Sequence, residues 1–389
     1  MKKILFYMDS LIMGGAEKIA IDYINMLYEE KKFQIKVIIN EDNGKNGNIL
    51  FEKLPLNIEH KFLVNENIMS KLNLYRELKQ KNVFYKIHYN YYLKRRRKEK
   101  SKIIDVIKNE EYDIFIDFYN ILPKELVDQR VISWQHMTLK GYSNKSLINF
   151  EERLKKMKKL VVLNEDMKNE IIKLFPKEKS KIEIIYNFFD IDKILRLSDN
   201  DLDLDNKEKE LIKEKYLFAC CRIDKQKDID TLIEAYKILK EKYNIKEKLY
   251  IAGDGDQKLR LENLVKKYCL KKDIIFLGTQ KNPYIWMKNA KLFVHSSHYE
   301  GFGMVLVEAL ITNGMVISSD CPVGPREILE NGKSGMLFPV GNKEKLVEEI
   351  LEVLNSKEII KKYRTESKRR IKDFSKEKIK VEIIKLLEE

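Results

Sequence analysis

The sequence predicts an α/β protein made of two doubly wound, Rossmann-like domains, each a parallel sheet covered by helices. Apolar strand-like runs alternate with helix-length amphipathic segments along almost the whole chain, a pattern typical of parallel α/β layers. The length of 389 residues exceeds what one hydrophobic core usually organises. Hydrophobic residues make up 44% of the chain, which indicates globular domains and not a disordered protein.

The first half of the chain contains seven expected strands, each a short apolar run bounded by polar or turn residues. These strands are expected at residues 3–8, 34–40, 59–64, 112–118, 130–135, 160–163 and 182–187. Amphipathic segments between them predict helices, notably at 16–30, 102–109 and 165–175. Residues 1–190 are therefore expected to form the first domain.

The second half repeats the alternation with six expected strands, at 216–222, 248–252, 274–277, 292–295, 315–318 and 335–338. The intervening helices are expected at 229–243, 257–268, 304–312 and 343–354. Residues 191–215 are polar and rich in Asp and Lys, so we expect a linker there. Residues 216–372 would then form the second domain, and 373–389 a C-terminal helix that returns to the first domain.

Charge and hydropathy limit where the protein can work. The formal net charge is +14, and the excess is concentrated between Lys79 and Lys102, where ten basic residues and one Glu give a net charge of +9. The chain opens with an alternating strand and not with an apolar signal core, and no apolar run is long enough to span a membrane. We expect a cytoplasmic protein, either in solution or peripheral on the inner face of the plasma membrane.

No metal, cofactor or disulfide is predicted. The four cysteines lack C-x-x-C spacing and have no nearby His, so reduced thiols are expected at Cys220, Cys221, Cys269 and Cys321. Several Asp-x-Asp pairs occur, but those near the linker are typical of solvated turns. Asp254 and Asp256 lie in a tight Ala-Gly-Asp-Gly-Asp turn that closes a strand.

The most informative segment is 300–308, in which two carboxylates bracket a Gly-x-Gly turn. From Met304 to Ile311 the sequence is apolar on every face except at Glu308, which predicts a buried helix carrying one carboxylate. A lone buried carboxylate is costly unless it is paired or hydrogen-bonded, so Glu308 either binds a ligand or pairs with a core Arg. Glu300 falls in the strand-to-helix corner, where ligands bind in open α/β sheets.

Three further features fall at the same kind of corner. Arg222 ends an expected strand and Lys227 follows in the next loop, so the two cations could clamp a diphosphate or simply be surface charges. Gly14-Gly15-Ala16-Glu17 follows the first strand, with a backbone able to approach a ligand closely. His136 ends the strand of Ile132-Ser-Trp-Gln-His and is either structural or part of a site.

At these positions the chain resembles the retaining glycosyltransferases of family 4, which have the GT-B fold. The resemblance runs from about residue 3 to residue 345. It depends on Gly14–Glu17, Arg222 with Lys227, Ala252–Gly255, Glu300-x7-Glu308 and Gly324-Pro-Arg-Glu-Ile with Asn331-Gly332. The block from Ser319 to Glu327 looks like the branch that makes bacterial surface glycans from UDP-sugars.

The resemblance implies a role for each matched position in the second domain. Arg222 and Lys227 would hold the donor diphosphate, and Glu308 would take the ribose hydroxyls. Glu300 and the backbone of Phe302, Gly303 and Met304 would orient the donor sugar. The loop from Gly278 to Lys281 would lie against the base.

In the first domain, which would bind the acceptor, Gly15 would meet the β-phosphate across a cleft and His136 would approach the sugar. The catalytic residues implied are Glu300, His136, Arg222 and Lys227, with no metal required. One position departs from the family, which usually has Gly before the phosphate Arg, where this chain has Cys221. Glu17 and Glu327 also match family positions, with a structural role equally open for each.

The implied activity is a metal-independent, front-face transfer of a hexose or N-acetylhexosamine from a UDP-sugar to a lipid-linked surface-glycan acceptor. Alternatives are a GT-B nucleotide-sugar epimerase and a nucleic-acid-binding protein that uses residues 79–102. In that basic segment Val83, Phe84, Ile87 and Tyr91 fall at helical spacing. It could bind an anionic membrane surface, bind RNA, or be a solvated helix; of these we expect the membrane and not a nucleic acid.

Overall fold

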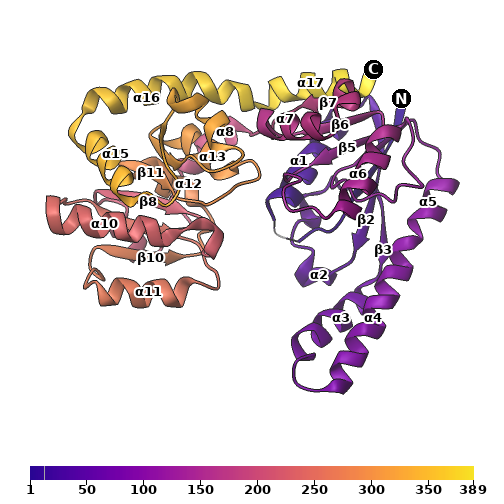
Figure 1. Cartoon of the computed structure of the whole chain (residues 1–389), viewed down its shortest axis with the longest axis horizontal. Helices are drawn as coiled ribbons and strands as arrows, with labels where there is room; N and C mark the ends of the chain where they lie inside the picture. Colours follow the sequence, from indigo (N-terminus) through magenta and orange to yellow (C-terminus); the bar gives the residue numbers. More distant parts are fainter. Residues whose placement is uncertain (13) are drawn as a thin grey trace. The chain divides into compact units, whose positions relative to one another are not determined.

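The chain divides into two compact units in the computed structural model, which describes residues 1–12 and 14–389. The first unit comprises Met1–Leu163, Met167–Ile185 and Leu386–Glu389, and the second comprises Asn164–Asp166 and Tyr186–Lys385. Each unit holds a parallel sheet with helices packed against it (Figure 1). The two Rossmann-like folds predicted from the sequence are therefore confirmed.

The first unit has a seven-stranded sheet in the order β3-β2-β1-β4-β5-β6-β7. Its strands pair in parallel throughout and run over β1 (Lys2–Met8), β2 (Phe33–Glu41), β3 (Glu59–Val64), β4 (Ile114–Asp117), β5 (Val131–Gln135), β6 (Lys159–Val162) and β7 (Ile182–Ile184). The main helices are α1 (Gly15–Glu29), α3 (Glu66–Leu78), α4 (Val83–Ser101), α5 (Ile103–Asn109), α6 (Asn144–Lys156) and α7 (Glu165–Leu174).

Aromatic residues fill the core of the first unit. Phe118 lies between Phe6 and Trp134, with ring centroids 5.4 Å and 5.6 Å away, and Tyr23 of α1 packs against the same ring at 5.4 Å. All four side chains are almost completely buried. Burial of such large apolar surfaces is the main stabilising contribution and fixes α1 on the sheet. Helix α1 begins at Gly15, so the glycine turn after β1 lies at the carboxyl edge of this sheet.

Helices α3 and α4 form a hairpin that projects from the first unit (Figure 1). Asn65 and Asn82 start the two helices, because each side chain accepts a hydrogen bond from the third residue beyond it. Val64, Ile68, Met69 and Leu72 form a small buried cluster that anchors the base of the hairpin. The helical spacing expected for residues 83–91 is therefore realised in α4.

The second unit has a six-stranded parallel sheet in the order β10-β9-β8-β11-β12-β13. Its strands are β8 (Tyr216–Cys220), β9 (Lys248–Ala252), β10 (Ile274–Gly278), β11 (Leu292–His295), β12 (Val316–Ser319) and β13 (Met336–Phe338). The longer helices are α8 (Ile191–Ser198), α10 (Ile229–Tyr243), α11 (Lys258–Lys267), α13 (Met304–Thr312), α15 (Lys343–Asn355), α16 (Lys357–Arg370) and α17 (Lys376–Glu388), with α9 (Asn206–Leu211), α12 (Pro283–Asn289) and α14 (Pro325–Ile328) shorter.

Residues 191–215, expected as a linker, contain helices α8 and α9 and belong to the second unit. Two of the aspartates in and beside this stretch, Asp190 and Asp205, are helix caps. Asp190 accepts a hydrogen bond from the backbone N–H of Lys193, and Asp205 forms a reciprocal capping box with Glu208. The last four residues of the chain belong to the first unit, where the Lys2 ammonium donates to the Leu387 carbonyl at 2.8 Å.

Candidate functional site

The strand order of the second sheet indicates one corner as the candidate ligand site. The chain fills the sheet outward from β8 to β9 and β10, then returns to the other side of β8 with β11. At such a reversal the loops after two neighbouring strands diverge and leave a crevice at the carboxyl edge. The loops after β8 and β11 carry Arg222, Lys227 and Glu300, so these three predicted residues fall at the reversal.

The loop after β8 is ordered by two aspartates that the sequence analysis did not single out. Asp224 accepts from the backbone N–H of Lys227 at 3.3 Å and pairs with the Arg222 guanidinium at 2.5 Å. Asp228, in the left-handed region at φ 45°, caps α10 through Thr231. The Arg222 side chain is 70% exposed, whereas that of Lys227 is 15% exposed. Arg222 is therefore open to a ligand, and Lys227 is held inside the corner.

Glu300 and Lys227 meet across the corner. The Lys227 ammonium lies 2.6 Å from Oε1 of Glu300, and the same oxygen accepts from the Ser297 hydroxyl at 2.6 Å and from Nε2 of His295 at 2.8 Å. The loops are also joined by their backbones, because His298 N–H donates to the Gln226 carbonyl. Oε2 of Glu300 receives no hydrogen bond from the residues that the structure describes, so it can accept one from a ligand hydroxyl.

The environment of Glu300 keeps it ionised. Burial by itself raises the pKa of this carboxyl, but the hydrogen bond and charge of His295 and those of Lys227 outweigh burial and lower the pKa to about 2. The result is a fixed anion, 9% exposed, beside a fixed cation. An anion of this kind can orient hydroxyl groups but cannot donate a proton near neutral pH.

Glu308 lies on α13, as predicted, and its carboxylate is half-buried. It accepts a hydrogen bond from the hydroxyl of Tyr284, on α12, at 3.0 Å. Burial raises the pKa of the Cys220 thiol, and the neighbouring Cys221 and Glu308 raise it further. Burial raises the pKa of the Cys221 thiol to about 12, and the charges of Lys227 and Glu300 also act on it. Both thiols are therefore protonated near neutral pH.

Two glycines let the neighbouring loop approach the Arg222 loop. A Cβ on Gly253 would lie 1.8 Å from the Cys221 carbonyl oxygen, and one on Gly255 would lie 2.2 Å from that of Ile223. The backbones bond directly, with Ile223 N–H donating to the Asp254 carbonyl at 2.8 Å. Cys221, where the family usually has Gly, is thus accommodated because its neighbours across the gap are glycines.

The remaining residues of the second unit that were predicted to bind the nucleotide-sugar donor also lie in loops that follow strands. Gly278 ends β10 at φ 71°, with open space where a Cβ would stand, and its carbonyl accepts from Gly253 N–H at 2.7 Å. Lys281 is exposed three residues further on. Gly303, at φ 94°, starts α13, so the positive end of that helix faces the corner.

The residues flanking Gly303 are held by packing. Phe302 is 5% exposed and packs against Phe374, and Gly324 lies against its carbonyl so closely that a Cβ there would be 2.1 Å away. Met304 is half-buried. Glu327 accepts from the Tyr186 hydroxyl and from Glu165 N–H, which gives it a structural role within the second unit.

In the first unit, His136 and Gly15 lie near the strand reversal between β1 and β4. Nε2 of His136 lies 2.6 Å from the Phe118 carbonyl and therefore donates to it, which leaves Nδ1 as the acceptor. Burial lowers the pKa of His136 to about 4, so the ring is neutral at pH 7. Gly15 is exposed, with open space at its Cβ position, whereas burial raises the pKa of Glu17.

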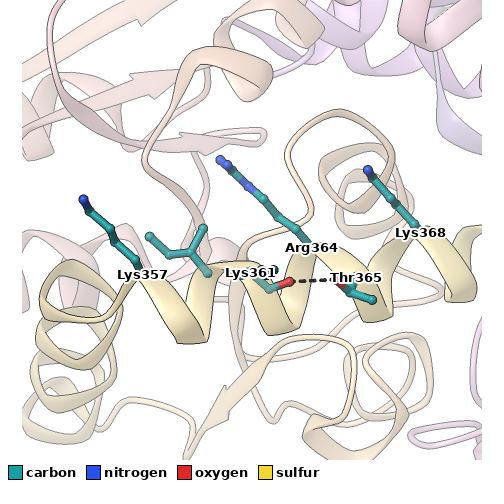
Figure 2. A pocket seen from close by; sticks show the side chains of 6 residues that line it. Lys357, Lys361, Arg364, Thr365 and Lys368 are labelled. Carbon is teal, nitrogen blue, oxygen red and sulfur yellow. Dashed lines mark hydrogen bonds between the residues drawn. The ribbon is translucent and has the colours of Figure 1, made fainter.

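Five residues in or near this corner were missed by sequence reasoning: Asp224, Asp228, Tyr284, His295 and Ser297. His295 and Ser297 do carry a signal, since polar residues at the end of an apolar strand indicate a site edge. Within 1–12 and 14–389, no cluster of three His, Cys, Asp or Glu could hold a metal ion. A hollow of about 510 Å³ lies along α16, lined mainly by cations (Figure 2) and separate from the residues above.

The chain is similar in fold to solved proteins over almost its whole length. An Anabaena protein, HepE, solved in complex with UDP and glucose, has a TM-score of 0.71 at 18% identity, with 100% of each chain covered. A mutant of a Staphylococcus aureus protein, TarM, solved with fondaparinux, alpha-GlcNAc-glycerol and UDP, has a TM-score of 0.66 at 16% identity, again covering 100% of both chains. These neighbours show the GT-B fold.

Residues 203–373 match the model of the family described as "Glycosyl transferases group 1". An uncharacterised glycosyltransferase of Methanocaldococcus jannaschii is 32% identical over 249 residues, 57% of this chain and 61% of that protein. An N-acetylgalactosamine-N,N'-diacetylbacillosaminyl-diphospho-undecaprenol 4-alpha-N-acetylgalactosaminyltransferase of Campylobacter jejuni is 31% identical over 218 residues, 56% of each chain. The chain thus spans about half to three-fifths of the length of these relatives.

Proposed function

We propose that this chain is a retaining glycosyltransferase that moves a hexose or N-acetylhexosamine from a UDP-sugar to a lipid-linked bacterial surface-glycan acceptor. One observation carries the proposal: Lys227 and Glu300 are paired at 2.6 Å in the strand-reversal corner whose loop after β8 also carries Arg222. The proposal also draws on relatives named for transfer to undecaprenol-linked glycans and on a neighbour solved with UDP-glucose.

The donor diphosphate would bind between the Arg222 loop and the start of α13. Arg222 offers a planar fork suited to two phosphate oxygens. Lys227 has three N–H donors, so it can keep Glu300 and still donate to phosphate. The first N–H groups of α13 add positive potential after Gly303. These groups need little movement on binding, because Asp224 and Glu300 already order them.

The two sugars of the donor, the transferred sugar and the ribose, would each hydrogen-bond to one of the two carboxylates. Oε2 of Glu300 would accept from a hydroxyl of the transferred sugar, and Glu308 would accept from the ribose hydroxyls while Tyr284 holds it. The loop from Gly278 to Lys281 would lie against the base.

In the reaction, the bond between the anomeric carbon and the diphosphate breaks as the acceptor hydroxyl attacks from the same face. Negative charge develops on the departing phosphate, and Arg222, Lys227 and α13 would stabilise it. The departing phosphate would take the acceptor proton. Glu300 is unsuited to general acid catalysis, since its pKa of about 2 leaves it ionised. The polar groups of the second unit thus supply electrostatics and orientation.

The test is a thermal-shift screen against a panel of nucleotide-sugars, followed by UDP-release assays with the sugar that binds. Slow UDP release without acceptor, with Glu308→Ala and Arg222→Ala each abolishing turnover while the melting temperature is largely kept, is the expected result. Interconversion of the sugar would instead indicate an epimerase. Wild-type turnover in either variant would overturn the site assignment.

A further inference from the structure

Helix α4 is a 19-residue helix with no buried residue. Its inner face is only half-buried, where Tyr89, Tyr92 and Leu93 pack on the small cluster at the base of the hairpin. No helix of the described residues is long and apolar enough to cross a membrane. A helix this exposed does not contribute a core to the first unit, so its sequence is set by something outside the fold.

The outer face of α4 presents apolar side chains to solvent. Val83 is 72% exposed, Phe84 58%, Ile87 60% and Tyr91 53%. At about 100° per residue these four positions fall within about 100° of arc, and at 1.5 Å per residue they extend over about 12 Å. Singly exposed hydrophobic residues are common, but four on one stripe form a patch that marks an interaction surface.

Basic residues continue and flank the stripe. Lys94, Arg95 and Lys98 follow it along the same face, and Lys86 and Arg97 border it. None of these five forms an ion pair with any residue in the part of the chain that the structure describes. By contrast Arg96 and Lys100, on the inner face, are paired with Glu41. The helix therefore separates its cations into an inner structural set and an outer set directed at solvent.

We propose that the outer face of α4 docks in the plane of an anionic lipid surface, with Phe84, Ile87 and Tyr91 in the acyl boundary and Lys94, Arg95 and Lys98 on the headgroups. Exposed aromatic and aliphatic residues between unpaired cations suit such an interface. The helix lies flat, because Lys79 and Lys81 occupy the hairpin tip and end-on insertion would bury them. This inference stands independently of the transfer reaction.

The charges alone would also suit RNA, but the aliphatic residues would not. RNA binding uses cations and stacked aromatic rings, whereas Val83 and Ile87, both largely exposed, offer no ring for a base. Phe84 packs on His88 with centroids 4.0 Å apart, so one face of that ring is already covered. A lipid surface accounts for the whole stripe.

The test is flotation of the full chain with phosphatidylcholine vesicles, with and without phosphatidylglycerol. Wild type should bind the anionic vesicles, and three triple variants divide the contributions. Loss of three cations should lower partitioning about a hundredfold, and loss of the apolar residues at least tenfold. The variants are Lys94→Gln/Arg95→Gln/Lys98→Gln, Phe84→Ser/Ile87→Ser/Tyr91→Ser, and the charge-matched control Lys357→Gln/Lys361→Gln/Lys368→Gln on α16 (Figure 2).

Unchanged partitioning in both α4 variants, or equal loss in the α16 control, would overturn the proposal, as would binding of poly(U) in place of vesicles. A depth measurement gives a second readout. Phe84→Trp and Ile148→Trp place a tryptophan at two positions that are each 58% exposed in the first unit. Lipid-borne quenchers should reach the first and not the second, while UDP affinity stays unchanged in every variant.

Discussion

The ionisation of Glu300 should be measurable as stability of the second unit. Its carboxylate is 9% exposed and accepts from Lys227, His295 and Ser297, and its pKa is lowered from an ordinary 4.5 to about 2. At 1.36 kcal/mol per pKa unit, ionisation stabilises the folded unit by on the order of 3 kcal/mol. Because the folded-state pKa is the lower one, this stabilisation is complete above pH 4.5 and is lost as the pH falls toward 2.

Glu300→Gln removes that contribution and leaves Lys227 without its carboxylate. Each unit contains one tryptophan, so Trp134→Phe leaves Trp286 as the reporter of the second unit. In urea at pH 7, Glu300→Gln in that background should lower the free energy of unfolding by about 3 kcal/mol. The deficit should shrink between pH 4.5 and 2. Glu352→Gln, exposed on α15, is the control. Equal midpoints for the Glu300 variant and its parent at pH 7 would refute the electrostatic account.

Three further predictions follow from single contacts. Gly255→Ala should weaken UDP binding at least tenfold by calorimetry, because its Cβ would lie 2.2 Å from the Ile223 carbonyl and must shift the Arg222 loop. Tyr284→Phe should raise the UDP dissociation constant several-fold, with a small change in melting temperature, since it removes a donor to Glu308. Tyr186→Phe should destabilise the second unit by about 1 kcal/mol in urea, with UDP affinity kept, since it removes a hydrogen bond to Glu327.

Local patterns predicted the sheets well. Strand periodicity depends on neighbouring residues, so β1, β9 and β11 begin and end within about two residues of their expected bounds. The segment 191–215 was misjudged because aspartates favour helix caps as much as turns, and composition does not distinguish the two. Capping spacings, such as Asp205 three residues before Glu208, were the available signal.

Sequence patterns identify candidate residues where a motif lies at a strand end, and they miss partners that come from distant segments. Glu300 and Lys227 were each recognised, but their contact joins residues 73 apart in the chain. Tyr284 and Glu308 are 24 residues apart, on two helices whose packing no local pattern specifies. Sequence spacing gives the edge of the sheet on which a side chain lies, whereas tertiary packing decides which oxygen faces which nitrogen.

The most direct test of the donor corner is calorimetric titration of UDP into the full chain and two lysine variants. Lys225 and Lys227 lie in the same turn, but Lys225 is exposed whereas Lys227 is held 2.6 Å from Glu300. Lys227→Ala should weaken UDP binding by about ten- to a hundredfold, since it removes a buried charged donor, and Lys225→Ala should change it less than threefold. Equal affinities in wild type and Lys227→Ala would contradict the account.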